Sequence, residues 1–156
     1  MVGSWLIRPA TLADVTAIGE AEQVCFGDPW SPSGIAELFE NETVVALAAE
    51  TGGPEIRLAG YAFARVIADE AEILNLAVLP LFRRRGIGGR LLEAAVTAVR
   101  TAGAGELFLE VRESNAAAKA LYLTRGFRPV GVRTGYYRNP RENAVVLRLG
   151  LGFVVN

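Results

Sequence analysis

Between residues 78 and 90 the chain passes from apolar residues into a run of arginines and glycines, Arg83-Arg84-Arg85-Gly86-Ile87-Gly88-Gly89-Arg90. The apolar residues before this run predict a strand, and those after it predict a helix from Gly86 to Arg100. Glycines let the backbone approach a ligand closely, and the free N–H groups and dipole of a helix N-terminus favour an anion. Arginines add contacts to phosphate. The stretch therefore predicts a pyrophosphate-binding site.

Spacing excludes two other phosphate-binding loops. A dinucleotide fingerprint would need a third glycine at position 91, which is Leu91, and a Walker loop would need a Gly-Lys-Ser/Thr step, which the chain lacks. Nucleic-acid binding by the arginine run is disfavoured, because the formal net charge of the whole chain is −1. The alternative interpretation is a solvated helix start with flexible glycines.

A second candidate is Glu110, within the apolar run Leu107-Phe108-Leu109-Glu110-Val111. Burial in an apolar strand disfavours a charged carboxylate and so makes a glutamate a stronger general base. The alternative is a structural glutamate paired with an arginine such as Arg112.

The third candidate is Ser114-Asn115-Ala116-Ala117-Ala118-Lys119-Ala120-Leu121-Tyr122, in which Ser114 or Asn115 caps a helix. The three alanines that follow would let this helix pack closely on a ligand. Tyr122 lies two turns along, and for an isolated tyrosine at this spacing a core aromatic is the simpler interpretation.

Composition narrows the chemistry further. The 156 residues contain no histidine and one cysteine, Cys25. These counts exclude Ser-His-Asp and Cys-His catalysis, an intrachain disulfide and a zinc site of thiolates or imidazoles, so we expect no metal. Lys119 is the one lysine among 16 basic residues, which leaves carboxylates, tyrosines, water and the backbone to move protons.

The net charge hides a strong asymmetry. Residues 1–82 hold three arginines and 12 acidic residues, whereas residues 83–156 hold 13 basic residues and 5 acidic ones. Such a division suggests one region that meets cations and another that meets anions, unless the two halves interleave in the fold. No apolar run is long enough to span a membrane, the first residues lack the features of a signal peptide, and the single free cysteine fits a reducing compartment. We therefore expect a cytoplasmic protein.

The pattern along the chain predicts one α/β (α+β) domain over residues 1–156, in the order β-α-α-β-β-β-α-β-α-β-β. Thr11 with Asp14 forms a weak capping box, and Ser31-Pro32 predicts a second helix start. Gly126 supplies the left-handed position after the helix that contains Tyr122. The predicted strands are 5–8, 43–49, 58–67, 71–78, 107–111, 127–138 and 144–151.

Taken together, the motifs resemble a known family. Arg83-Arg84-Arg85-Gly86-Ile87-Gly88 is similar to the acetyl-CoA motif of the GNAT N-acetyltransferases, and nearly the whole chain fits that family's order of elements. A closer resemblance is to ribosomal-protein alanine N-acetyltransferases of the RimI type. That resemblance rests on Asp28-Pro29-Trp30-Ser31, Asn75-Leu76-Ala77-Val78, Leu109-Glu110-Val111-Arg112, Ser114-Asn115-Ala116-Ala117-Ala118, Leu121-Tyr122, Gly126-Phe127 and Tyr136-Tyr137.

The resemblance implies a mixed, mostly antiparallel sheet of about seven strands with about four helices, and acetyl transfer from acetyl-CoA to a protein N-terminus, in particular the alanine of a small-subunit ribosomal protein. It implies Glu110 as general base and Tyr122 as general acid. The residues implied for the cofactor are Leu76, Ala77 and Val78 for the acetyl-pantetheine arm, Arg84, Arg85, Gly86, Ile87, Gly88 and Gly89 for the pyrophosphate, and Asn115.

The final hairpin departs from the family pattern. Residues 139–144 are shorter than expected, and Asn143 stands where an aspartate is expected. Because that hairpin helps to wall the peptide site, two further hypotheses stay open: an acetyltransferase that acts on protein lysine or a small amine, and a non-catalytic acyl-CoA-binding domain. No nucleic-acid or membrane partner is expected. The resemblance implies that the acceptor amine attacks the thioester directly, without an acyl-enzyme. Cys25 is therefore interpreted as a packing residue and not as a nucleophile.

Overall fold

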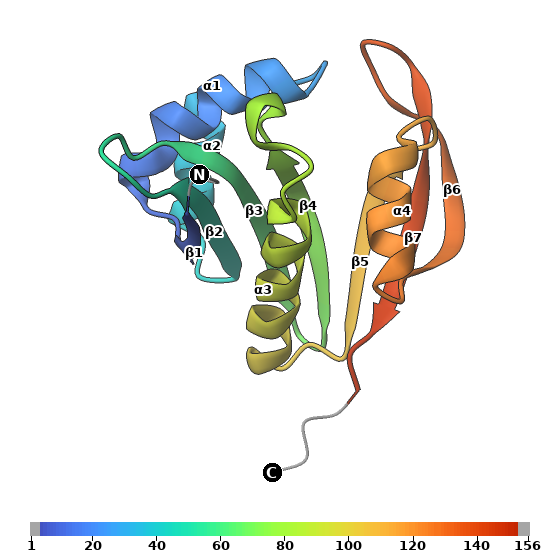
Figure 1. Ribbon diagram of the computed structural model, residues 1–156. Helices are drawn as coiled ribbons and strands as arrows, with labels where there is room; N and C mark the ends of the chain where they lie inside the picture. The colour runs from blue at the N-terminus through green and yellow to red at the C-terminus, as the bar shows by residue number, and fades with distance from the viewer. Residues whose placement is uncertain (1–3, 153–156) are drawn as a thin grey trace.

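The computed structural model describes residues 4–152, which form a seven-stranded sheet with helices on both faces (Figure 1). The strands lie in the order β1-β2-β3-β4-β5-β7-β6, and all neighbours are antiparallel except β4 and β5. The strands are β1 (Trp5–Pro9), β2 (Val44–Thr51), β3 (Leu58–Ile67), β4 (Glu70–Val78), β5 (Glu106–Arg112), β6 (Arg128–Tyr137) and β7 (Glu142–Gly150). The expected mixed, mostly antiparallel sheet is confirmed.

The helices begin at the capping residues that the sequence indicates. The short 3-10 helix η1 (Leu12–Asp14) leads into α1 (Val15–Cys25), and Thr11 and Asp14 form the predicted capping box. Ser31 caps α2 (Pro32–Phe39) by accepting a hydrogen bond from the Gly34 N–H at 3.1 Å. After a second 3-10 turn, η2 (Pro80–Phe82), the helices are α3 (Ile87–Thr101) and α4 (Ala116–Thr124). Each boundary lies within a few residues of its prediction.

The alternation of side chains along β3 separates the two helical layers. Tyr61 and Phe63 point to the face covered by α1 and α2, where they join a core with Ile18 and Ile35. The small residues Ala62 and Ala64, which alternate with them, point to the opposite face, so that α3 packs closely on the sheet. On that second face α4 covers β5 and β7, as Figure 1 shows.

The sheet is interrupted at its centre. Phe63 of β3 is opposite Asn75 of β4, but the next residue, Ala64, is opposite Ile73, so Leu74 is an extra, bulged residue. The parallel pairing of β4 with β5 runs from Glu70 to Glu72 and ends just before this bulge. Beyond it the two strands diverge, with α3 beside one and α4 beside the other (Figure 1). The divergence opens the sheet along the second half of β4.

Candidate active site

The opening between β4 and β5 exposes one backbone edge of β4. In the described part of the chain, the β4 residues after Glu72 pair with β3 on one side but have no partner on β5. Buried backbone N–H and C=O groups require partners, so a strand with one free edge can bind an extended ligand. Leu76, Ala77 and Val78, the residues predicted for the acetyl-pantetheine arm, lie on this free edge.

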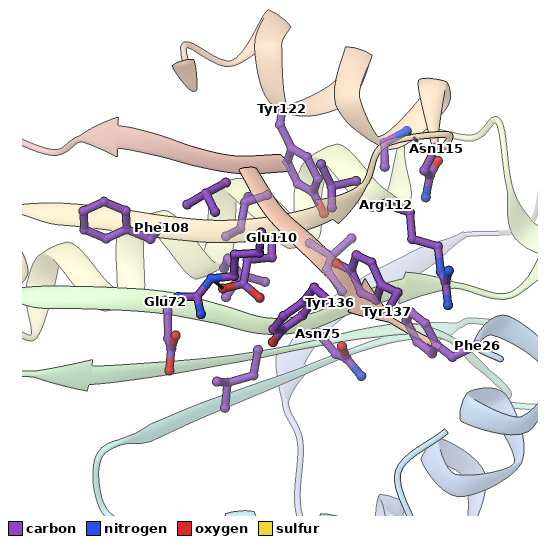
Figure 2. A pocket seen from close by; sticks show the side chains of 18 of the residues that line it. Phe26, Glu72, Asn75, Phe108, Glu110, Arg112, Asn115, Tyr122, Tyr136 and Tyr137 are labelled. Carbon is purple, nitrogen blue, oxygen red and sulfur yellow. Dashed lines mark hydrogen bonds and ion pairs between the residues drawn. The ribbon is translucent and has the colours of Figure 1, made fainter. Parts of the chain in front are cut away.

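A cleft of about 1010 Å³ continues from this opening across the sheet. Its walls come from five regions: the segment joining α1 to α2, the end of strand β3, strand β4, strand β5 with α4, and the β6–β7 hairpin. Figure 2 shows the cleft from close by, with Tyr122 entering from α4 and Glu110, Tyr136 and Tyr137 on the strands below it. The cleft therefore brings the two predicted proton-transfer residues into one chamber.

Glu110 lines the cleft because alternate residues of β5 point to opposite faces of the sheet. Leu107, Leu109 and Val111 are buried in the core, whereas Glu110 is half-buried and lines the cleft. Its Oε1 forms an ion pair with Arg133 Nε, at a distance of 2.9 Å. The alternative partner considered from sequence, Arg112, is wrong, since Arg112 pairs instead with Glu142 at 3.4 Å. The Arg133 side chain is 59% exposed, so Glu110 has an exchangeable cationic partner.

Tyr122 is both a core aromatic and a cleft residue. Its ring packs edge-to-face on Phe127, with 5.7 Å between the ring centroids, and it also lines the cleft. Burial raises the pKa of Tyr122 to about 12. The hydroxyl is therefore fully protonated at neutral pH, as a proton donor must be.

Two further tyrosines face Glu110, and no role for them was assigned from the sequence. Tyr136 and Tyr137 come from the end of β6, with ring centroids 5.1 Å apart. Hydrogen bonding to Glu110, together with partial burial, raises the pKa of Tyr136, and burial followed by the charge of Glu110 raises that of Tyr137. The Arg112 guanidinium lies 4.5 Å from the Tyr137 ring centroid. The signal available in the sequence was the Tyr136-Tyr137 pair itself, one of the motifs that carry the family resemblance.

The predicted pyrophosphate site lies beside this cleft, at the start of α3. Gly86 occupies the N-cap position with φ +80°, a left-handed conformation that favours glycine, and no side chain caps the helix. The first N–H groups of the helix, from Ile87 to Gly89, are therefore open to an anion. Arg84 also has a positive φ, +63°. For a long side chain that is uncommon and occurs mainly at functional loops.

Arg125, which the sequence analysis did not select, lies over the same helix turn. A β-carbon on Gly89 would overlap the guanidinium of Arg125, which reaches across from the end of α4. It also forms a weak ion pair with Glu93 at 3.9 Å. Arginines thus lie near the start of α3 both in the loop that precedes it and at the end of α4.

Asn115 is positioned as the sequence predicted. Its Oδ1 accepts a hydrogen bond from the Ala118 N–H at 3.1 Å, which settles the choice between Ser114 and Asn115 as the N-cap of α4. Asn115 and Ala118 also line the cleft, so one of the three alanines faces the space where a ligand would lie, whereas Ala116 and Ala117 are exposed.

The final hairpin is anchored to β5. Arg112 donates hydrogen bonds to the carbonyl oxygens of Arg138 and Pro140, at 2.7 and 2.8 Å. Asn143, which replaces an expected aspartate, accepts a hydrogen bond from the Gly135 N–H at 2.8 Å. The substitution therefore preserves an acceptor at this position while it removes a negative charge.

Glu22 is a buried acid that the sequence analysis overlooked. It is 0% exposed and accepts hydrogen bonds from the Trp30 N–H at 2.8 Å, from Asn75 Nδ2 at 3.0 Å and from the Tyr61 hydroxyl. Burial raises its pKa, against the effect of these hydrogen bonds. Its place on the apolar face of α1, beside Ile18 and Ala21, was the signal that could have identified it.

The acidic and basic halves of the sequence meet in the cleft. Glu70, Glu72 and Glu110 line it together with four arginines, at positions 65, 112, 133 and 138. The expected separation into an anion-facing and a cation-facing region is therefore not seen here. Within residues 4–152 no group of three or more acidic or cysteine side chains could hold a metal ion, and no helix is long and apolar enough to cross a membrane.

The chain is similar to known proteins in sequence and in structure. Residues 15–127 match the model of the acetyltransferase (GNAT) family. The [ribosomal protein bS18]-alanine N-acetyltransferase of Salmonella typhimurium is 38% identical over 138 residues, which cover 87% of this chain and 90% of that protein. The corresponding Escherichia coli K12 protein is 36% identical over the same coverage.

Solved structures agree with this match. The crystal structure of the Escherichia coli ribosomal-protein-S18-alanine N-acetyltransferase superposes with a TM-score of 0.87 at 32% identity, covering 98% of this chain and 97% of that one. Arabidopsis thaliana NAA60 in complex with acetyl-CoA also gives a TM-score of 0.87, covering 94% of this chain and 98% of that one. Its identity is 18%, so this second match supports the fold alone.

Proposed function

Since the chain belongs to the GNAT family of acetyltransferases, we propose that it transfers the acetyl group of acetyl-CoA to the α-amine of a protein N-terminus, namely the N-terminal alanine of ribosomal protein bS18. One observation carries the proposal. The free β4 edge, Glu110 and Tyr122 open onto one cleft, beside an uncapped helix N-terminus. The choice of acceptor rests on the Salmonella and Escherichia relatives, whose names give bS18 alanine as their acceptor.

The residues at the opening suit coenzyme A. The extended pantetheine arm carries amide groups that can pair with the backbone of Leu76, Ala77 and Val78 on the free edge of β4. Its pyrophosphate fits the loop from Arg84 to Gly89, where open N–H groups and the helix dipole stabilise negative charge. Asn115 contacts the cofactor from the start of α4.

The reaction needs one proton acceptor and one proton donor. An α-amine has a pKa of roughly 7.7–8.0 and is largely an ammonium ion at neutral pH. Glu110 takes a proton from it, directly or through water, and the nitrogen lone pair then attacks the thioester carbonyl. The Val78 N–H stabilises the oxyanion. As the C–S bond breaks, Tyr122 gives its proton to the departing thiolate, and the acetyl group stays on nitrogen. The nitrogen loses its second excess proton as the amide forms; this proton returns through water to the Tyr122 phenolate, and Glu110 releases its proton to solvent.

No acyl-enzyme is required. Burial raises the pKa of the Cys25 thiol, although Arg83 nearby opposes this effect, so Cys25 is not activated as a nucleophile. It is the last residue of α1, where it packs against the core under α1 and α2 and also lines the cleft, and we propose that it is a packing residue. We also propose that residues 1–156 make up one acetyltransferase domain, and that the protein works in the cytoplasm, where a ribosomal acceptor is found.

The test is acetyl transfer by the purified protein to a panel of acceptors. An alanine-leading peptide with basic residues after it should be acetylated at its α-amine. The same peptide with a blocked N-terminus and an internal lysine, and a polyamine, should not. Acetylation of the lysine or the polyamine alone would contradict the proposed acceptor, and tight CoA binding without transfer to any acceptor would indicate a non-catalytic domain. Mass spectrometry of bS18 with and without the gene product extends the test to the cell.

A further inference from the structure

Asn75 is the polar side chain that links the cleft to the buried carboxylate of Glu22. It follows the Leu74 bulge on β4 and lies one residue before the proposed cofactor edge at Leu76. Its side chain lines the cleft, and Figure 2 shows it beside Tyr136 and Tyr137. Its amide nitrogen, Nδ2, donates to Glu22 Oε2 at 3.0 Å.

The surroundings of Glu22 fix the orientation of that amide. The Trp30 N–H can only donate, so it occupies Glu22 Oε1, and the Tyr61 hydroxyl and Asn75 Nδ2 share Oε2. A carboxylate that receives three donors offers acceptors and no donor. Asn75 must therefore turn its nitrogen toward Glu22 and leave its carbonyl oxygen, Oδ1, on the side of the cleft. In Figure 2 the oxygen lies on the side of the two tyrosines.

The charge of Glu22 adds to the effect of this orientation. Among residues 4–152 no arginine or lysine forms an ion pair with Glu22, so hydrogen bonds alone hold the buried carboxylate. The amide dipole of Asn75 points its positive end at that carboxylate and its negative end at the cleft. A negative dipole end beside a buried anion attracts N–H donors, and a cationic donor most strongly.

We infer that Asn75 Oδ1 accepts a hydrogen bond from the N-terminal residue of the acceptor, and that Glu22 is the positioning residue that fixes this amide. The inference rests on the proposed function and adds a binding residue for the acceptor, on the wall opposite Glu110. It assigns the α1–α2 segment, which Glu22 holds through the Trp30 N–H, to acceptor binding rather than to cofactor binding.

The experiment measures steady-state kinetics with an alanine-leading peptide, and CoA affinity by calorimetry, for wild type and four variants. Asn75→Leu keeps the side-chain volume but removes the amide. Glu22→Gln keeps the shape but introduces a donor, so that the Asn75 amide turns its nitrogen to the cleft. The third variant combines both changes, and Tyr61→Phe is the control, because it leaves the bond between Glu22 and Asn75 intact.

We expect Asn75→Leu and Glu22→Gln each to raise the peptide KM about 10-fold, the loss expected for a hydrogen bond to a charged group. Because the effect lies in binding, kcat and the CoA Kd should stay within about twofold of wild type. Glu22 acts through Asn75, so the combined variant should be no worse than Asn75→Leu alone. Tyr61→Phe should keep the wild-type KM.

Two outcomes would overturn the inference. One is a peptide KM for Asn75→Leu within about twofold of wild type. The other is multiplication of the two effects in the combined variant, which would show that Glu22 acts on the α1–α2 segment independently of Asn75. If Glu22→Gln loses its cooperative unfolding transition, Asn75→Leu decides alone. A wild-type protein that acetylates no α-amine would contradict the proposed function, and the inference with it, whereas an active Asn75→Leu with unchanged KM contradicts the inference only.

Discussion

The α-carbon of Gly27 lies against the backbone of Asn139, so closely that a β-carbon at position 27 would overlap the Asn139 carbonyl oxygen. Gly27 belongs to the segment between α1 and α2, and Asn139 to the turn between β6 and β7. These two segments, which both line the cleft, therefore meet. In Figure 1 the end of α1 and the tip of the β6–β7 hairpin lie near each other at the top.

Gly27→Ala should weaken acceptor binding. The new methyl group meets backbone rather than a flexible side chain, so one of the two segments must shift, and a shift of about 1 Å in a positioning wall can reduce turnover strongly. We expect kcat/KM for the peptide to fall at least about tenfold while the CoA Kd is unchanged. The matched control is Gly131→Ala on β6, where a β-carbon has open space. Equal activity of the two variants would show that the contact is not needed.

Glu110→Gln and Tyr122→Phe should each lower kcat by about 10² to 10⁴ without a matching loss of CoA affinity, the range expected when a general acid or base is removed. Because burial raises the pKa of Tyr122 to about 12, loss of the acid should not limit the rate until the pH approaches that value. Rapid-quench measurement of acetyl transfer over a range of pH tests both the loss of kcat in the variants and the pH dependence of the wild type. Normal turnover by the double variant would exclude the mechanism.

Acetyl-CoA binding should depend on salt, because the arginines around the start of α3 are exposed and salt would screen the charges of the proposed phosphate contacts. We expect the acetyl-CoA KM to rise with NaCl between about 0.05 and 0.5 M. Gly86→Ala should also raise it, by several-fold, because alanine is strained at φ +80°. Gly105→Ala, which has space for a β-carbon and lies away from this loop, is the control. A KM that is independent of salt would argue against pyrophosphate binding here.

Asp14 should stabilise the protein in a pH-dependent way. Arg8 donates to both of its oxygens, at 2.9 and 2.8 Å, and these hydrogen bonds lower the pKa of Asp14 below its ordinary 3.8. The stabilisation is therefore complete above that ordinary value and is lost as the pH falls through the lower, folded-state pKa. Asp14→Asn should cost about 1–3 kcal/mol at pH 7, by urea unfolding. If Asp14→Asn lowered the free energy of unfolding by the same amount at pH 2, the pH-dependent stabilisation by Asp14 would be contradicted.

Local features were predictable from sequence because they depend on neighbours. The capping box at Thr11 and Asp14, the cap at Ser31 and the left-handed conformation of Gly126 each follow from a few adjacent residues. The seven strands followed from apolar patterning. Boundaries differed most where tertiary pairing extends a strand, as at the end of β2, where Thr51 pairs with Trp5 of β1.

The details of the site depended on contacts between distant residues. Glu110 pairs with Arg133 on another strand rather than with Arg112, which lies on the same face of β5 but pairs with Glu142. The bond between Glu22 and Asn75 joins residues 53 positions apart. The bulge at Leu74 carries no glycine or proline to mark it. No local pattern encodes such pairings, so only the folded chain identifies them.

The divergence of β4 and β5 leaves the protein as two half-sheets joined by a short parallel contact, from Glu70 to Glu72 of β4. A pantetheine arm that pairs with the free β4 edge would act as an added strand and would fill the gap between β4 and β5. The cosubstrate would then be a structural element as well as a reagent. Amide hydrogen exchange along residues 74–78 should slow when CoA binds, and the thermal midpoint of the whole domain should rise with CoA concentration.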